Sequence, residues 1–161
     1  MLENFLIENR VGSLIWKASN LWQLKLRKIL KPFNLSTNEY LILEAAKILL
    51  NHNSNVCQNE IAKLTQIDIT VVSVKLKLLE RKKFISRSFL NDNRKKIIKV
   101  LKSGDILIDK ISPIIDTEEY NLFNKLNNEN FNFTNSLKLL LGKKIRIKAE
   151  TLKNIISYDT K

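Results

Sequence analysis

Residues 58–83 decide the fold, and they read QNEIAKLTQIDITVVSVKLKLLERKK. Apolar residues recur there at helical spacing, which predicts a short helix over Gln58–Thr65 and a longer one from Ile69 to about Lys83. Asp68 precedes the longer helix, where its carboxylate can accept a hydrogen bond from the first amides. Two helices joined by so short a connection predict a helix–turn–helix whose second helix is the reading element.

The apolar period changes to two after the second helix. Segments 84–89 (FISRSF) and 96–101 (KIIKVL) are rich in β-branched and aromatic residues, and they flank the turn-forming triplet Asn91-Asp92-Asn93. This pattern predicts a β-hairpin, and its position directly after the reading helix makes it a wing with its tip over residues 90–96.

Long helices are predicted on both sides of this centre. Residues 5–31 carry an apolar stripe that Pro32 ends, and Ser36 with Glu39 has the spacing of a capping box for a helix reaching about Leu50. Beyond Gly104 a helix resumes, with a kink or break expected at Pro113. An Asn-rich connector over 127–135 and a last helix over about 134–147 complete the expected order.

The predicted fold class is therefore mostly α with a small β-hairpin wing, a winged helix–turn–helix between long N- and C-terminal helices. We expect one chain, 1–161, with a winged-helix lobe at 34–102. Residues 1–33 and 103–149 would form a helical lobe, and residues 150–161 a frayed tail.

Charge is segregated along the chain. The net charge is +12, and residues 75–102 hold eleven lysines and arginines against Glu80 and Asp92, a net +9. Residues 103–129 lean the other way, with six acidic residues against two lysines. A basic surface gathered on one helix and its neighbouring hairpin favours a nucleic-acid partner.

Other classes of function lack the residues they need. Cys57 is the single cysteine, which excludes an internal disulfide and fits a reducing, cytoplasmic location. The lone His52 and the absence of a metal-ligand cluster or a glycine-rich phosphate loop argue against an enzyme, and we expect no cofactor and no metal. No apolar run is long enough for a bilayer span, so we expect no membrane partner.

The ordered set of elements resembles the MarR family of bacterial winged-helix regulators. The similarity covers roughly Val11 to Leu141. Its motifs are LSTNEY at 35–40, QNEIA at 58–62, Leu79-Glu80, DNR at 92–94, and Val100 with Gly104. The resemblance implies a homodimeric, sequence-specific DNA-binding transcriptional regulator. We expect it to be a repressor relieved by a small anionic or aromatic effector.

The expected DNA contacts lie on the two helices and the wing. The outward half of the second helix faces the major groove, and amides at the start of the first helix meet phosphates. The resemblance assigns Arg94 to the minor groove and Asp92 to the carboxylate that orients it. Lysines beside them would neutralise phosphate. The full expected set is Gln58, Thr70, Ser73, Lys75, Lys77, Asp92, Arg94, Lys95 and Lys96.

Dimerisation is expected because the terminal helices carry more apolar surface than a small winged helix can cover. In the resembling family these helices interlock about a twofold axis, which implies a pseudo-palindromic duplex site. The residues expected in the seam are Leu6, Ile7, Val11, Ile114, Leu137, Leu140 and Leu141.

Two positions on the reading helix depart from the family pattern, and Leu101 likewise replaces a common threonine before Gly104. Val71 and Val74 replace a threonine and a basic residue common in relatives, and with Leu78 they form a second apolar stripe on the reading helix. The favoured interpretation is a helix packed on both sides. One alternative is contact with thymine methyl groups, and hence an A·T-rich site. Another is that the winged helix docks protein or RNA instead of duplex DNA.

Overall fold

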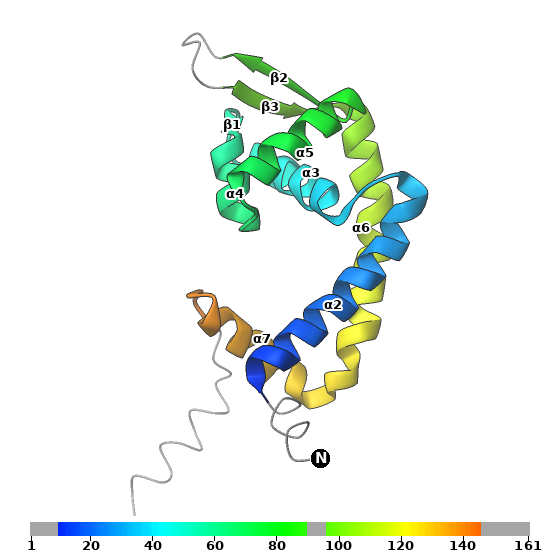
Figure 1. The fold of residues 1–161 in the computed structure, drawn as a ribbon, viewed down its shortest axis with the longest axis vertical. Coiled ribbons are helices and arrows are strands. Elements are labelled where there is room, and N and C mark those ends of the chain that lie inside the picture. The colour runs from blue at the N-terminus through cyan, green and yellow to red at the C-terminus, as the bar shows by residue number, and fades with distance from the viewer. Residues whose placement is uncertain (1–9, 90–95, 146–161) are drawn as a thin grey trace, which may run out of the picture. The chain divides into compact units, whose positions relative to one another are not determined.

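The computed structural model describes residues 10–89 and 96–145 (Figure 1). The chain divides into two compact units, Met1–Glu118 and Glu119–Lys161. The elements in chain order are α2 (Val11–Leu30), η1 (Lys31–Phe33), α3 (Thr37–Leu50), β1 (Val56–Cys57), α4 (Gln58–Thr65), α5 (Ile69–Arg81), β2 (Ile85–Phe89), β3 (Lys96–Val100), α6 (Lys102–Phe123), η2 (Asn124–Glu129) and α7 (Asn130–Leu140). The predicted fold class, mostly helical with a β-hairpin wing, is confirmed.

The helix–turn–helix has the predicted bounds at α4 and a shorter second helix. α5 begins at Ile69 as predicted and ends at Arg81, two residues before the expected end at Lys83. Lys83 has a left-handed backbone with φ of 60°, which ends the helix and turns the chain into β2. The prediction missed this end because lysine carries no helix-stop signal of the kind that glycine gives.

The core of the first unit is built around α3. Its capping box is present, since the Glu39 amide donates to Ser36 Oγ and the Glu39 carboxylate accepts from the Ser36 amide. Ile42, Leu43 and Ala46 are fully buried on the same helix. The buried side chains that pack together are Leu26, Leu30, Leu35, Tyr40, Ile42, Leu43, Ala45, Ala46, Val56, Ile61, Val72, Leu76, Leu79, Ile85, Ile98, Ile108, Ile111 and Ile115.

The sheet has three antiparallel strands in the order β1-β3-β2, one more than predicted. β1 is a two-residue strand, and its Val56 faces Ile98 of β3. On the other side of β3, Ile85 of β2 pairs with Val100. Val56, Ile85 and Ile98 are buried, so the base of the wing joins the core through apolar side chains.

Gly104 lets α6 approach the base of the wing. A Cβ atom at this position would lie 2.4 Å from the Phe84 carbonyl oxygen, closer than any side chain tolerates. The same oxygen accepts a hydrogen bond from the Leu101 amide at 2.9 Å. Glycine is therefore required for close backbone approach, as at other packed helix–strand junctions.

The helices α2 and α6 differ from expectation in detail. The described part of the first helix is Val11–Leu30, and Pro32 lies in the short η1 helix that follows it. α6 begins at Lys102, before Gly104, and continues through Pro113 without the expected break. Within the first unit, α2 and α6 lie along one another and are joined by the Lys25–Glu118 ion pair (Figure 1).

The second unit replaces the expected Asn-rich connector with helix. η2 and α7 cover Asn124–Leu140, so the last helix begins four residues earlier than predicted and ends well before residue 147. Asn127, inside η2, has a non-helical backbone with φ of 46°, so η2 consists of two short helical pieces joined across a kink. The rings of Phe123 and Phe133 stack with centroids 6.3 Å apart, and aromatic packing of this kind offsets the poor helix propensity of asparagine.

Candidate nucleic-acid interface

The outer face of α5 is a single stripe of exposed residues, Thr70, Val74, Lys77 and Arg81. Their spacing of four, three and four residues places them on one side of the helix. The opposite side, formed by Val72, Leu76 and Leu79, is buried in the core. α5 thus separates a folding face from a solvent face, and we call these four aligned residues the α5 stripe. Ile69, the fifth exposed residue of the helix, is 38% exposed and lies off this line at the first helical position.

The turn before α5 fixes the start of this stripe. Gln66 has a left-handed backbone with φ of 58°, and its side chain donates to the Lys63 carbonyl at 2.8 Å. Asp68 accepts from the Thr70 amide at 2.8 Å and also from the Thr70 hydroxyl. These hydrogen bonds, the hydroxyl's first, hold the pKa of Asp68 below its ordinary value. The first turn of the reading helix is therefore rigidly capped.

Two basic residues of the segment 75–102 form ion pairs within the fold. Arg87 of β2 donates from Nε to Glu80 Oε2 at 3.0 Å, with a second contact from Nη2 to the same oxygen. Lys82 donates to Glu39 Oε1 at 2.7 Å. Both cations are half-buried, and their charge is balanced by a carboxylate within the fold.

Several other cations of the basic segment are exposed to solvent. Lys77 and Arg81 enter no ion pair within residues 10–89 and 96–145. On β3, Lys96 and Lys99 are exposed, and the Lys96 ammonium lies 4.9 Å from the centroid of the exposed Phe89 ring. The α5 stripe and β3 therefore both carry positive charge that a phosphate backbone can reach.

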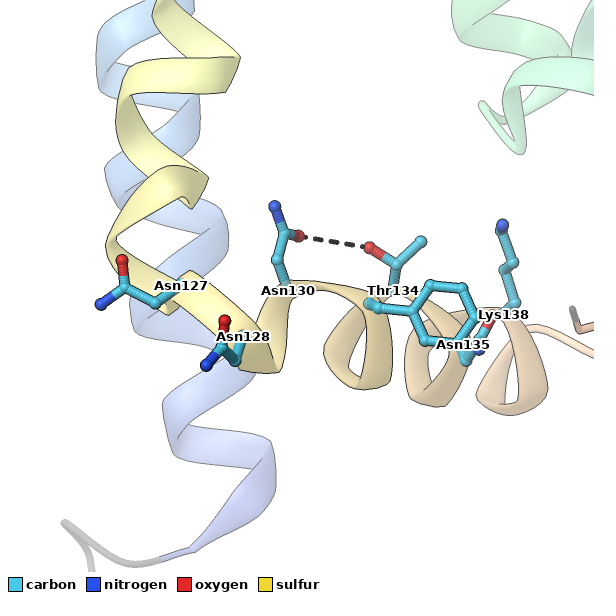
Figure 2. Close-up of a pocket in the computed structure, with 7 residues that line it drawn as sticks. Asn127, Asn128, Asn130, Thr134, Asn135 and Lys138 are labelled. Atoms are coloured by element: carbon cyan, nitrogen blue, oxygen red, sulfur yellow. Dashed lines mark hydrogen bonds between the residues drawn. The ribbon is translucent and has the colours of Figure 1, made fainter. Parts of the chain in front are cut away.

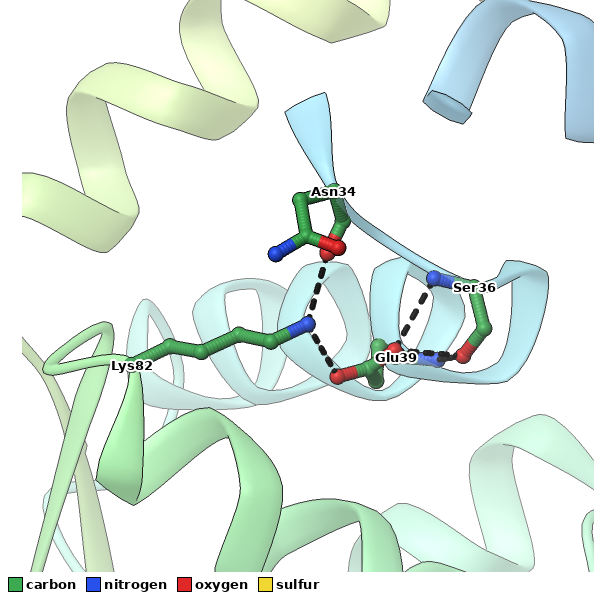
Figure 3. A network of polar contacts seen from close by, with 4 residues as sticks. All are labelled: Asn34, Ser36, Glu39 and Lys82. Atoms are coloured by element: carbon green, nitrogen blue, oxygen red, sulfur yellow. Dashed lines mark hydrogen bonds and ion pairs between the residues drawn. The ribbon is translucent and has the colours of Figure 1, made fainter. Parts of the chain in front are cut away.

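A polar network fixes the C-terminal end of α5 (Figure 3). Besides its bond to Glu39, the Lys82 ammonium donates to the Asn34 carbonyl at 2.6 Å, and the Ser36 hydroxyl donates to Glu39 Oε2 at 2.6 Å. Burial opposes ionisation of Glu39, yet the hydrogen bonds from Lys82 and Ser36 outweigh burial and lower the pKa of this carboxyl. The network ties the end of α5 to the start of α3.

A second polar contact joins α3 to α6. The buried Tyr40 hydroxyl donates to Glu44 at 2.6 Å and lies 3.2 Å from Ser112 Oγ. Burial, followed by the bond to Glu44, raises the pKa of Tyr40 far above its ordinary value, so the phenol stays neutral. Lys47 of α3 adds ion pairs to Asp109 at 2.7 Å and Asp105 at 3.5 Å. These contacts tie α3 to α6.

The structure separates the expected DNA contacts into groups. Gln58, Thr70, Lys77 and Lys96 are exposed, whereas Ser73 and Lys75 are half-buried beside the α5 stripe. Asp92, Arg94 and Lys95 lie outside the described residues. The sequence analysis left out Arg81 because it placed the DNA contacts of this helix in its N-terminal half.

Val74 is exposed, in contrast to the interpretation that the sequence analysis favoured. Its side chain is 55% exposed, so the interpretation of α5 as packed on both sides fails at this residue. Val71 and Leu78 are half-buried. The period of the apolar residues alone could not show which of two adjacent stripes faces the core.

The expected dimer residues that the structure describes are largely exposed. Val11 is 71% exposed, Leu140 69% and Leu141 65%. Ile114 is exposed and Leu137 half-buried, while Leu6 and Ile7 lie outside the described residues.

The second unit carries a cavity of about 530 Å³ on the face of η2 and α7 (Figure 2). Its lining is polar, with the Thr134 hydroxyl 3.5 Å from the Asn130 amide oxygen. The lining residues are Asn127, Asn128, Asn130, Phe131, Thr134, Asn135 and Lys138.

Neither a metal cluster nor a membrane span is found in the part of the chain that the structure describes. No three His, Cys, Asp or Glu side chains gather there in a way that could hold a metal ion. None of the helices described is both long and apolar enough to pass through a bilayer. Cys57 is half-buried at the N-cap of α4, where its amide donates to Glu60 at 2.8 Å.

Known proteins with similar sequence or structure are DNA-binding regulators. YdcH of Bacillus subtilis (strain 168), an uncharacterised HTH-type transcriptional regulator, is 31% identical over 106 residues, which are 65% of this chain and 72% of the relative. No protein-family model matches the sequence.

Solved structures extend the similarity to most of the chain. The MepR–DNA complex of S. aureus has a TM-score of 0.73 at 27% identity, over 84% of this chain and 96% of that chain. A MarR-family regulator from Rhodococcus sp. RHA1 has a TM-score of 0.71 at 20% identity, over 84% and 95%, and supports the fold alone.

Proposed function

Because this chain belongs to the MarR family of winged helix–turn–helix transcriptional regulators, we propose that it acts as a homodimeric repressor that reads a pseudo-palindromic duplex. That it is a DNA-binding transcriptional regulator follows from its relatives. The proposal adds the dimer, the repression and the contacts. A non-enzymatic role in the cytoplasm completes it.

The α5 stripe is the observation that carries the proposal. An α-helix fits the major groove, and this one presents a hydroxyl, an apolar side chain and two cations along its outer side. Thr70 at the capped end can reach base edges, while Lys77 and Arg81 can reach base edges or phosphates further along. Arg94 and Asp92 enter the proposal through the family resemblance, as the minor-groove contact of the wing.

The dimer is supported by apolar exposure on both units. Side chains such as Val11, Leu140 and Leu141 lose contact with water if a second copy covers them, and each fully buried aliphatic side chain contributes about 1.5–3 kcal/mol. We assign 34–102 to DNA binding and 1–33 with 103–149 to dimerisation. Twofold pairing places the two reading helices about one helical turn, roughly 34 Å, apart.

The test is binding to a duplex selected from a random pool, followed by fluorescence anisotropy at several salt concentrations. About six neutralised phosphates predict a log–log slope near −5. Arg81→Ala should reduce the magnitude of the slope by about 1 for each half-site, whereas Lys77→Ala should also change the preferred sequence. Lys28→Ala, an exposed change on α2, serves as the control.

Two results would count against the proposal. Failure to select any duplex would remove DNA recognition, and competition by single-stranded RNA for the same site would favour the docking alternative. Repression is tested separately, by reporter transcription from the selected site with and without the protein. We propose release by a small anionic or aromatic effector, for which salicylate is a suitable probe in the same assay.

A further inference from the structure

Val74 occupies the centre of the α5 stripe, four residues after Thr70 and three before Lys77. An isolated exposed valine is ordinary on a protein surface. This one is 55% exposed in the middle of the solvent face, while Val71 and Leu78 continue the apolar surface on the same helix at half-buried positions. The reading helix therefore presents an apolar ridge where its polar residues would meet the base edges.

The charges beside Val74 identify what covers this ridge. Lys77 and Arg81 follow it on the same stripe and form no ion pair among the described residues, so a polyanion fits better than an apolar protein surface. On the major-groove edges of DNA, the C5-methyl of thymine is the apolar group that distinguishes one base pair from the others. Val74 can therefore contact a thymine methyl group while the neighbouring cations contact the phosphate backbone.

The stiffness of the side chain suits this contact. Valine in a helix holds one strongly preferred χ1 rotamer, so its two methyl groups stand in a fixed direction before DNA arrives. Asp68 caps the turn before α5 and the Lys82–Glu39 pair secures its end, which keeps the helix itself in place. Little conformational freedom is lost when such a methyl group meets its partner.

We propose that Val74 is a specificity-determining residue that reads the C5-methyl group of a thymine in each half-site of the duplex. This inference rests on the proposed function and names part of its sequence preference. It requires a thymine at a fixed position in the selected site, and it predicts that the methyl group, not the hydrogen-bonding edge, is what the protein recognises there.

The experiment is a double-mutant cycle between Val74 and the thymine methyl. Each thymine of the selected duplex is replaced in turn by deoxyuridine, which removes the methyl and leaves the hydrogen-bonding edge intact. For the wild-type protein, this replacement at one position should lower the affinity for the duplex about fourfold per half-site. That is the effect of no longer removing one methylene-sized group from water. Val74→Ala should bind the unmodified duplex with a similar loss.

Coupling between the two changes decides the matter. At the critical position, deoxyuridine should have no further effect on Val74→Ala. Ile48→Ala, a change at an exposed aliphatic residue of α3, should retain the full fourfold loss. Thermal unfolding of the variants checks that each is folded. If wild-type protein binds tightly and no thymine position couples to Val74, the inference fails and the proposed function stands. If no duplex is bound at all, both fail.

Discussion

Lys82 and Glu39 form an ion pair of 2.7 Å that joins the residue after α5 to the first turn of α3. Glu39 is buried and its second oxygen is held by Ser36, so the capping box fixes the carboxylate that Lys82 meets. The basic residue is therefore a structural part of the reading helix, although in the sequence it is one of several adjacent lysines.

Stability should depend on pH through Glu39. Its folded-state pKa lies below the ordinary value of 4.5, because the bonds from Lys82 and Ser36 outweigh the opposing effect of burial. The contribution of the carboxylate is therefore fully present above about pH 4.5 and is lost as the pH falls through the folded-state pKa.

Glu39→Gln isolates this contribution, since glutamine keeps the capping geometry and removes the charge. The variant should lose about 1 kcal/mol at pH 7, because the partner Lys82 is partly exposed to water. Urea unfolding between pH 3 and 7 measures the difference from wild type, which should narrow at the acid end. A difference that stays constant with pH would contradict the assignment.

Arg87→Ala should loosen the wing from the reading helix. Arg87 donates from two nitrogens to one Glu80 oxygen, and its side chain is mostly buried. We expect a loss of about 1 kcal/mol in unfolding free energy and a several-fold loss in DNA affinity, because the wing is no longer held in its binding position. Anisotropy and thermal unfolding together test this.

The exposed Arg81 is the contrasting position. Arg81→Ala should weaken DNA binding without lowering stability, since the described residues offer it no internal partner. Equal loss of stability in both variants would show that the Arg87–Glu80 pair has no special structural role.

Gly104→Ala should destabilise the first unit by about 1–3 kcal/mol, the usual cost of overpacking. The added Cβ meets the Phe84 carbonyl oxygen at 2.4 Å, and backbone cannot move aside as a flexible side chain can. The matched control is Gly12→Ala on α2, where a Cβ meets nothing within 4 Å. That change should be neutral or stabilise by up to about 1 kcal/mol. Chemical denaturation of both variants gives the comparison.

Leu140→Asp should convert the proposed dimer into monomers. Leu140 is 69% exposed on α7, and a carboxylate there would have to be desolvated within a subunit interface. Sedimentation velocity over a range of concentrations measures the change. Leu64→Asp, an exposed position on α4, should leave the oligomeric state intact, and an unchanged dimer in Leu140→Asp would remove this residue from the seam.

Local signals in the sequence were sufficient for the elements whose ends are marked by side chains. Ser36 with Glu39, and Asp68, start helices where the capping pattern predicts. β1 had no such signal, since two residues become a strand only by pairing with Ile97 and Ile98 about forty positions away. Non-local pairing of this kind is invisible to a pattern read along the chain.

The location of the candidate interface could be predicted from the sequence, but the individual residues that form it could not. A count of basic residues does not distinguish Lys82 and Arg87 from Lys77. In the structure, Lys82 forms an ion pair with Glu39 and Arg87 forms one with Glu80. The exposure of Val74 depends on which side of α5 meets α3, and two adjacent apolar stripes left that undecided. Tertiary contacts, not local propensity, select the residues that face a partner.

Because α5 has a buried side and a solvent-exposed side, its DNA sequence preference can change during evolution without loss of the fold. The buried residues Val72, Leu76 and Leu79 pack against the core. The exposed residues Thr70, Val74 and Lys77 take no part in that packing. Substitutions on the outer side typically alter stability by less than about 0.5 kcal/mol. A duplicated copy of this gene could thus acquire a different operator through a few changes on one helix while its scaffold remains under unchanged selection.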